Sequence, residues 1–187
     1  MFNGEKRTLD VQDIISKLRF LSKVKKGERL QVEGLAVVEN TWYAKFVRAW
    51  NTMGEVNDTC EIKEGRRKSL AFIKDLYETG LRLAKSIINE TSSYYTDLWN
   101  MLIKGLKDAQ PGITNLMNYY ESDRLYIAEV ETFVDVLNAK INDLVTERKL
   151  ILDQNLIEED GSASPLVLKD RRSTVDQFTT SRLQDNN

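Results

Sequence analysis

Histidine is absent from this chain of 187 residues, and Cys60 is its only cysteine. Without histidine the chain can have no histidine-based catalytic triad, no imidazole metal ligand and no imidazole acid–base catalyst. One cysteine can form neither an internal disulfide nor a thiolate zinc site. The sequence also carries no P-loop, no glycine-rich dinucleotide fingerprint and no HExxH motif. We therefore expect a protein that is not an enzyme and that has no catalytic residue, metal site or cofactor.

Proline and glycine are also scarce, with two and nine residues respectively, which favours long helices over a loop-rich β architecture. The 27 basic and 29 acidic residues leave a net charge of -2, whereas a dedicated nucleic-acid-binding domain usually carries a strong positive excess. No uncharged apolar stretch approaches the ~18 residues of a membrane span, and the polar residues 1–7 are unlike a secretory signal. The composition predicts a mainly α-helical protein of a reducing, cytosolic environment.

Residues 1–110 are predicted to form a helical domain, because apolar residues recur at helical spacing over 11–24, 41–53, 64–89 and 94–109. Asp10, Thr41 and Ser92 are suitable N-caps, and Gly27 suits the end of the first helix. Near residues 30–38 a mixture of β-branched residues and glycine favours a short extended segment. Core positions are expected at Val11, Ile14, Ile15, Leu18, Leu21, Val24, Trp42, Phe46, Ala49, Trp50, Met53, Leu70, Ile73, Leu76, Tyr77, Leu81, Ala84, Ile87, Ile88, Leu98, Met101, Leu102 and Leu106.

Residues 111–157 are predicted to form one long helix with a heptad seam, a candidate coiled coil. The seam residues are Ile127, Val130, Val134, Leu137, Ile141, Leu144 and Ile151. Extended backwards, the same register includes Tyr120, Leu116 and Ile113. β-branched residues alternating with leucine are typical of two-stranded coiled coils, so the seam is a candidate partner-binding surface for a second copy or another protein. The alternative is that it packs only against helices of its own chain.

Residues 158–187 are predicted to form an extended tail that begins with the acidic segment Glu158-Glu159-Asp160. This segment lacks the ligand spacing of an EF-hand, so a solvated hinge is the favoured interpretation. Apolar residues are sparse in the tail, and they are the expected anchors on a partner. These anchors are Leu166, Val167, Leu168 and Phe178.

The basic triplet Arg66, Arg67 and Lys68 has two interpretations. It can contact phosphates, lipid headgroups or an acidic protein face. It can also be an ordinary solvated part of a helix surface. No aromatic residue is interleaved with it, so nucleic acid is not the expected main partner.

Residues 14–90 resemble a family of small uncharacterised proteins of nucleocytoplasmic large DNA viruses, of the iridovirus type. The residues that carry the resemblance are Ile15-Ser16-Lys17-Leu18-Arg19-Phe20, Lys23, Lys25-Lys26-Gly27-Glu28, Trp42, Arg48, Glu64-Gly65-Arg66-Arg67, Leu70 and Ile73. The resemblance implies a viral origin, and from this we expect a minor capsid protein that is assembled in the host cytoplasm and located in the virion. Such proteins cement capsomers beneath the major capsid lattice, often near an inner membrane.

The expected function is therefore structural. The chain would link capsomers by pairing of its long helix and by its C-terminal strap, with the major and other minor capsid proteins as partners and no small-molecule substrate. The alternative is a cytoplasmic viral adaptor or regulatory protein that touches nucleic acid weakly through Arg66, Arg67 and Lys68.

Overall fold

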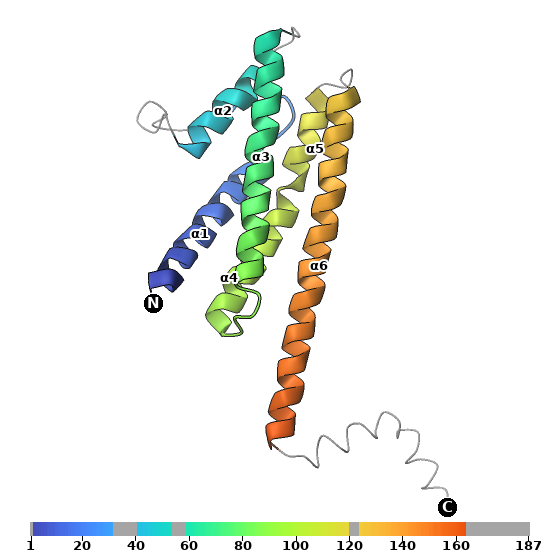
Figure 1. Cartoon of the computed structure of the whole chain (residues 1–187). Coiled ribbons are helices and arrows are strands. Elements are labelled where there is room, and N and C mark those ends of the chain that lie inside the picture. Colours follow the sequence, from blue (N-terminus) through green and yellow to red (C-terminus); the bar gives the residue numbers. More distant parts are fainter. Residues whose placement is uncertain (1, 32–40, 54–58, 120–123, 164–187) are drawn as a thin grey trace, which may run out of the picture. The chain divides into compact units, whose positions relative to one another are not determined.

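The computed structural model describes residues 2–31, 41–53, 59–119 and 124–163, and within them it contains six α-helices and no strand (Figure 1). The helices are α1 (Phe2–Ser22), α2 (Trp42–Met53), α3 (Cys60–Ser86), α4 (Ser93–Asp108), α5 (Gln110–Tyr119) and α6 (Arg124–Ala163). The predicted mainly helical fold is thus confirmed. The chain divides into two compact units, Met1–Leu144 and Val145–Asn187, which are described separately.

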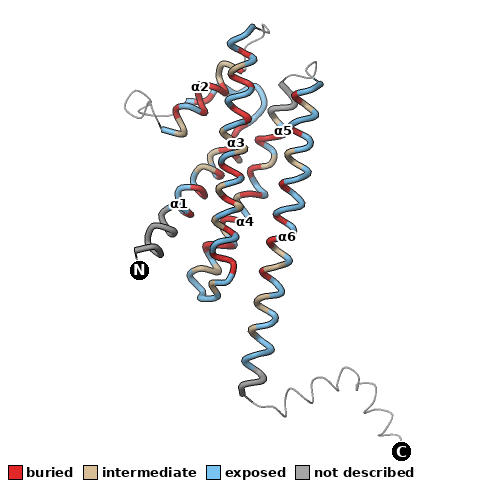
Figure 2. The backbone as a smooth tube through the Cα atoms, viewed as in Figure 1, coloured by how far each residue is buried: buried red, intermediate tan, exposed pale blue. Residues whose placement is uncertain are grey.

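Helix α3 is the central element of the first unit, because α1, α2 and α4 all pack against it. The predicted apolar stripe over residues 11–24 is buried at all six positions, and Phe46, Trp50, Ile73 and Tyr77 are also fully buried (Figure 2). Trp42, Leu81 and Met101 are only half-buried. The ring of Trp42 stacks on Phe46 with centroids 5.2 Å apart, so it packs against the core aromatic residues of α2.

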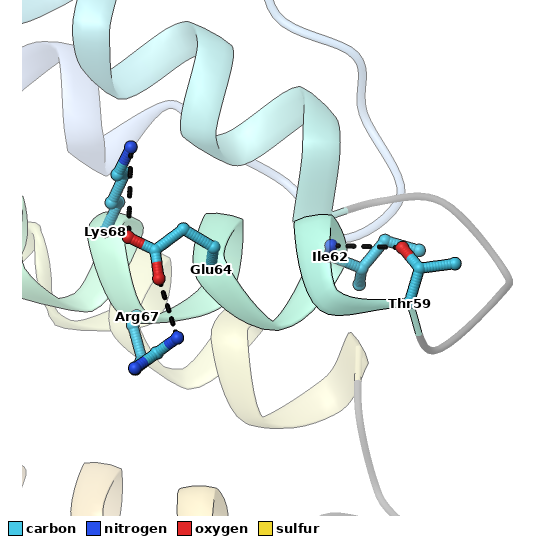
Figure 3. Close-up of polar contacts among 5 residues, drawn as sticks. All are labelled: Thr59, Ile62, Glu64, Arg67 and Lys68. Carbon is cyan, nitrogen blue, oxygen red and sulfur yellow. Dashed lines mark hydrogen bonds and ion pairs between the residues drawn. The ribbon is translucent and has the colours of Figure 1, made fainter.

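Several predicted helix ends are confirmed by their capping hydrogen bonds. The hydroxyl of Thr41 accepts from the backbone N–H of Ala44 at 3.3 Å, and that of Ser92 accepts from Tyr95 at 3.4 Å. The third helix begins earlier than predicted, at Cys60 instead of residue 64. Thr59 caps α3 by accepting from the Ile62 N–H at 3.3 Å, as Figure 3 shows. Each hydroxyl satisfies one of the N–H groups that have no partner within a helix.

The start and end of α1 differ from the prediction. The helix begins at Phe2, so Asp10 lies inside it instead of capping it. No proline interrupts residues 1–10, and Glu5, Lys6 and Arg7 are good helix formers, which allows the helix to begin earlier. At the other end α1 stops at Ser22, and Gly27, with φ +78°, serves a separate turn in which Glu28 N–H donates to Lys25 O at 3.2 Å.

The predicted single helix over 111–157 is wrong, because α5 and α6 are separate helices. The physical reason is the packing of α5 on the end of α1. Ile113 is fully buried, and a Cβ at Gly112 would lie 2.7 Å from the Leu21 carbonyl oxygen. The Asn115 amide also donates to Val24 O at 2.8 Å. The backward extension of the seam to Ile113 therefore belongs to another helix.

At its C-terminal end α6 continues to Ala163, so residues 158–163 are helical and not part of an extended tail. Glu158 and Glu159 are good helix formers, and no proline occurs between Pro111 and Pro165. The remaining tail, with its anchors Leu166, Val167, Leu168 and Phe178, lies outside the described residues. The extended segment expected near residues 30–38 falls largely on residues 32–40, which are also outside them. Among the described helices, none is long and apolar enough to cross a membrane.

Candidate protein-interaction surfaces

The heptad seam of α6 is occupied within the chain over its first half. Val130, Leu137, Ile141 and Leu144 are between 0% and 8% exposed, and Ile127 and Val134 are half-buried. Of the two interpretations of the seam, the structure shows internal packing for these residues. The partner-binding assignment of Val130, Leu137, Ile141 and Leu144 is corrected accordingly. Ile151, which lies in the second unit, is half-buried.

Three contacts attach this part of α6 to α3 in the first unit. The Lys74 ammonium lies 2.6 Å from the Glu129 carboxylate and 5.8 Å from the centre of the Phe133 ring. The rings of Tyr77 and Phe133 pack in an edge-to-face arrangement, with centroids 5.9 Å apart. The Tyr77 hydroxyl donates to Leu106 O at 3.1 Å, and burial raises the pKa of this hydroxyl far above its usual range. Residues 124–144 of α6 are thus attached to α3 by aromatic and ionic contacts.

The basic triplet does not form one surface patch. Arg66 is only 3% exposed, and its guanidinium lies 5.8 Å from the centre of the Tyr126 ring, so it is an internal residue. Arg67 and Lys68 remain at the surface, and Figure 3 shows both reaching the Glu64 carboxylate, at 2.6 and 3.9 Å. The predicted contact surface therefore loses Arg66. Its two remaining cations share a carboxylate partner.

A groove of about 870 Å³ runs between α2 and α3 in the first unit. Its shape depends on Gly65, because a Cβ there would lie 3.1 Å from both Ala49 O and Thr52 Cβ. The two helices run in opposite directions along the groove, since Trp42 at the start of α2 lies beside Phe72, with ring centroids 6.2 Å apart. Residues late in α2 thus lie opposite residues early in α3.

The groove carries charges of both signs. Its Phe72 end carries Lys45, Arg48 and Lys68, and its other end carries Glu61 beside the exposed thiol of Cys60. Glu64 lies between these ends, with its carboxylate 3.9 Å from the Lys68 ammonium. Ala49 is a buried apolar residue of the lining, and Phe72 is half-buried. Sequence patterns could not reveal this surface, because it combines residues of two helices that are far apart in the sequence. The groove can accommodate an elongated ligand with apolar side chains and a charge at each end.

A second surface lies on the part of α6 that belongs to the second unit. Leu150, Leu156 and Ile157 are 63%, 60% and 55% exposed, which is unusual for large apolar side chains on one helix. Together with Lys149 and Asp153 they share one helical face at spacings of three, four and seven residues, here called the distal face. Sequence reasoning missed it by following only the seam. The available signal was the occurrence of three large apolar residues off the heptad positions.

A metal-binding cluster is not evident in the part of the chain that the structure describes. No group of three or more cysteine, aspartate or glutamate residues there is arranged to hold a metal ion. Arg148, which falls on a heptad position of the seam, is buried, and burial lowers the pKa of its guanidinium.

Comparison with known proteins gives no significant similarity. No protein-family model matches the chain, and no curated protein or solved structure matches it either. Functional inference therefore starts from the groove and the distal face.

Proposed function

We propose that this chain is a non-catalytic structural protein that joins other proteins in an assembly, and that it acts as a minor capsid protein of a large DNA virus. The observation that carries the structural role is the distal face of α6, where Leu150, Leu156 and Ile157 are more than half exposed. Contiguous apolar side chains at a surface mark protein interaction sites. The viral setting derives from the resemblance of residues 14–90 to the iridovirus-type family.

The arrangement of α6 supports this role in two ways. Within the first unit, its first half contacts α3 through the Lys74–Glu129 ion pair and the Tyr77–Phe133 ring contact. Its second half offers the distal face, on which apolar residues alternate with Lys149 and Asp153. An amphipathic helix with such anchors is a common docking element between proteins. In this proposal the helix pairs with its partner through the distal face and not through the heptad seam.

The C-terminal strap remains part of the proposal. Residues 164–187 contain the apolar segment Leu166-Val167-Leu168 and the single aromatic Phe178 in a mostly polar stretch. Sparse apolar anchors suit a segment that becomes ordered along a partner surface. Such a strap would extend the contact that the distal face makes with neighbouring capsid proteins.

Cross-linking mass spectrometry on the native material tests the proposal. Lys149 on the distal face and Lys169 in the tail should link to capsid proteins or to a second copy of the chain. Lys107 near the end of α4 is exposed and lies outside both surfaces, so it serves as the internal reference. Links from Lys149 and Lys169 that stay within one chain, or that lead only to nucleic-acid-processing proteins, would contradict the structural assignment.

The alternative of an adaptor that touches nucleic acid is favoured by one observation, the cluster of Lys45, Arg48 and Lys68 at one end of the groove. Phosphate contacts of this kind make affinity strongly dependent on salt. A binding titration with single-stranded and duplex DNA and RNA would support the adaptor only if affinity falls about tenfold or more between 50 and 200 mM salt. Absence of binding at low salt would exclude it.

A further inference from the structure

We infer that Thr174 is a phosphorylation site for a basophilic protein kinase, one that selects arginine before the acceptor hydroxyl. The chain contains two Arg-Arg pairs, Arg66-Arg67 and Arg171-Arg172. Each pair is followed by one residue, then a hydroxyl residue and an aliphatic residue, in Lys68-Ser69-Leu70 and Ser173-Thr174-Val175. The fold removes the first of these two candidates and leaves the second. This inference goes beyond the proposed function and does not depend on it.

The spacing of the second arginine pair suits recognition by such a kinase. Arg171 and Arg172 lie three and two residues before Thr174, where carboxylates beside the peptide site of the enzyme can pair with both guanidinium groups. Val175 directly follows the acceptor and offers an aliphatic side chain to an apolar subsite. Kinases distinguish their substrates by charge patterns of this kind. Among the hydroxyl residues of 164–187, only Thr174 has arginine at both positions.

Ser69 cannot be the acceptor in the folded chain. It lies inside α3 and is 0% exposed, so its hydroxyl does not reach the γ-phosphate of a nucleotide bound to another protein. Arg66, three residues before it, is 3% exposed and lies 5.8 Å from the centre of the Tyr126 ring, so its guanidinium does not reach an acidic subsite. Arg67 is paired with the Glu64 carboxylate at 2.6 Å. The two segments are equivalent in sequence pattern, and the fold separates them.

Thr174 belongs to the C-terminal segment 164–187, which follows the end of α6 at Ala163 and lies outside the described residues. The composition of this segment is mostly polar, and it predicts an extended tail. Polar segments of this type that bind partners are commonly switched by phosphorylation. The sequence context and the arginine spacing therefore point to the same residue.

The modification is a phosphoryl transfer from ATP. The Thr174 hydroxyl oxygen attacks the γ-phosphorus, the bond from that phosphorus to the bridging oxygen of the departing ADP breaks, and the hydroxyl proton passes to the catalytic aspartate of the kinase. The product carries a charge of about −1.5 to −2 at neutral pH. Residues 169–172 contain three basic side chains and one acidic one, so the phosphate offsets the positive excess of this segment. The change falls between the expected strap anchors Leu168 and Phe178.

The test uses the purified full chain, Mg-ATP and the catalytic subunit of cAMP-dependent protein kinase as a basophilic probe enzyme. Tandem mass spectrometry should locate phosphate on Thr174 and none on Ser69, and Thr174→Ala should abolish the incorporation. Arg171→Ala should lower the initial rate at least about tenfold, because one charge-assisted pair with the enzyme is lost. Two matched controls should keep the wild-type rate. Lys169→Ala removes a nearby cation outside the two selected positions, and Ser173→Ala removes the adjacent hydroxyl.

The chain isolated from its native source, with phosphatase inhibitors present, should carry phosphate on the same residue. A wild-type chain that takes up no phosphate while a reference peptide with the same arginine spacing is fully converted would overturn the inference. Phosphate on Ser69 or on another residue in place of Thr174 would also overturn it, as would native material without the Thr174 phosphopeptide. These outcomes are separable from failure of the proposed function, which the cross-links from Lys149 and Lys169 decide.

Discussion

The guanidinium of Arg66 lies 5.8 Å from the centre of the Tyr126 ring, and this cation–π contact joins α3 to the beginning of α6. Arg66 is 3% exposed and Tyr126 is 7% exposed, so the contact is shielded from water. The Tyr126 hydroxyl also approaches Met53 Sδ at 4.0 Å, which brings α2 to the same place. One buried residue pair thus connects three helices of the first unit.

Replacing Arg66 should therefore destabilise the fold rather than weaken a surface contact. We expect Arg66→Ala to lower the free energy of unfolding by about 2–3 kcal/mol, because it removes the cation–π contact and the packing of the side-chain stem. Arg67→Ala is the matched control. It removes an exposed ion pair with Glu64 and should cost less than about 1 kcal/mol. Urea unfolding of both variants measures the difference, and equal losses would contradict the internal role of Arg66.

Two glycines in helices should respond differently to an added methyl group. At Gly112 the Cβ would lie 2.7 Å from a backbone oxygen, that of Leu21, which cannot move without shifting the end of α1. Gly112→Ala should therefore destabilise by about 2 kcal/mol or more, despite the better helix propensity of alanine. At Gly80 the nearest atom is the end of the flexible Leu106 side chain, at 3.1 Å. Gly80→Ala should stay within about 1 kcal/mol of wild type in thermal or urea unfolding.

Most of the core was predictable because it repeats locally. The stripe from Val11 to Val24 has the helical period, and the structure buries all of it. The separation of α5 from α6 was not predictable in the same way, because no glycine or proline marks residues 120–123. What determines it is a long-range contact, the packing of Gly112 and Ile113 on the end of α1. Sequence periodicity reports on faces of helices and not on which helices meet.

The two candidate surfaces also differ in how far the sequence could predict them. The distal face is local in sequence, and the exposed apolar residues Leu150 and Ile157, seven residues apart, could have been recognised from their position off the seam. The groove is not local, because Lys45 of α2 and Lys68 of α3 become neighbours only through the close helix approach at Gly65. Arg66 and Arg67 are adjacent in the sequence, yet Arg66 is buried and Arg67 is exposed. Helical rotation, not composition, decides which member of a basic triplet reaches solvent.

Leucines of the seam and of the distal face should contribute differently to stability. Leu137 is 1% exposed, so Leu137→Ala should lower the free energy of unfolding by about 2–4 kcal/mol through lost burial and a cavity. Leu150 is 63% exposed, and Leu150→Ala should change the free energy of unfolding by less than about 0.5 kcal/mol. Urea unfolding at two protein concentrations checks both values. A loss at Leu137 that depends on concentration would instead indicate that the seam pairs between chains.

The N-cap of α3 should make a measurable contribution. Thr59→Ala removes the hydroxyl that accepts from the Ile62 N–H, and we expect a loss of about 1 kcal/mol, or about 2–4 °C in melting temperature. Thr59→Ser keeps an accepting hydroxyl and should retain most of the stability. Equal melting temperatures for the alanine and serine variants would show that the cap is unimportant. The readout is thermal unfolding followed by circular dichroism.

Tyr77 should give the protein a specific weakness at alkaline pH. Burial raises the pKa of its hydroxyl in the folded chain, whereas in the unfolded chain it titrates near pH 10. The folded state therefore holds the proton more tightly, and its stabilising effect, complete below about pH 10, is lost as the pH rises above that value.

Tyr77→Phe isolates this effect from the other titrating groups. At pH 8 the variant should be about 1 kcal/mol less stable than wild type, because Leu106 O loses its hydrogen-bond donor. Between about pH 10 and 11 the wild type should lose up to about 1.4 kcal/mol more than the variant, since one proton is involved. The deficit of the variant should therefore shrink or reverse in urea unfolding at the higher pH. Tyr94→Phe, at a position 53% exposed, should show no such convergence, and a deficit of Tyr77→Phe that stays constant with pH would contradict the buried hydroxyl.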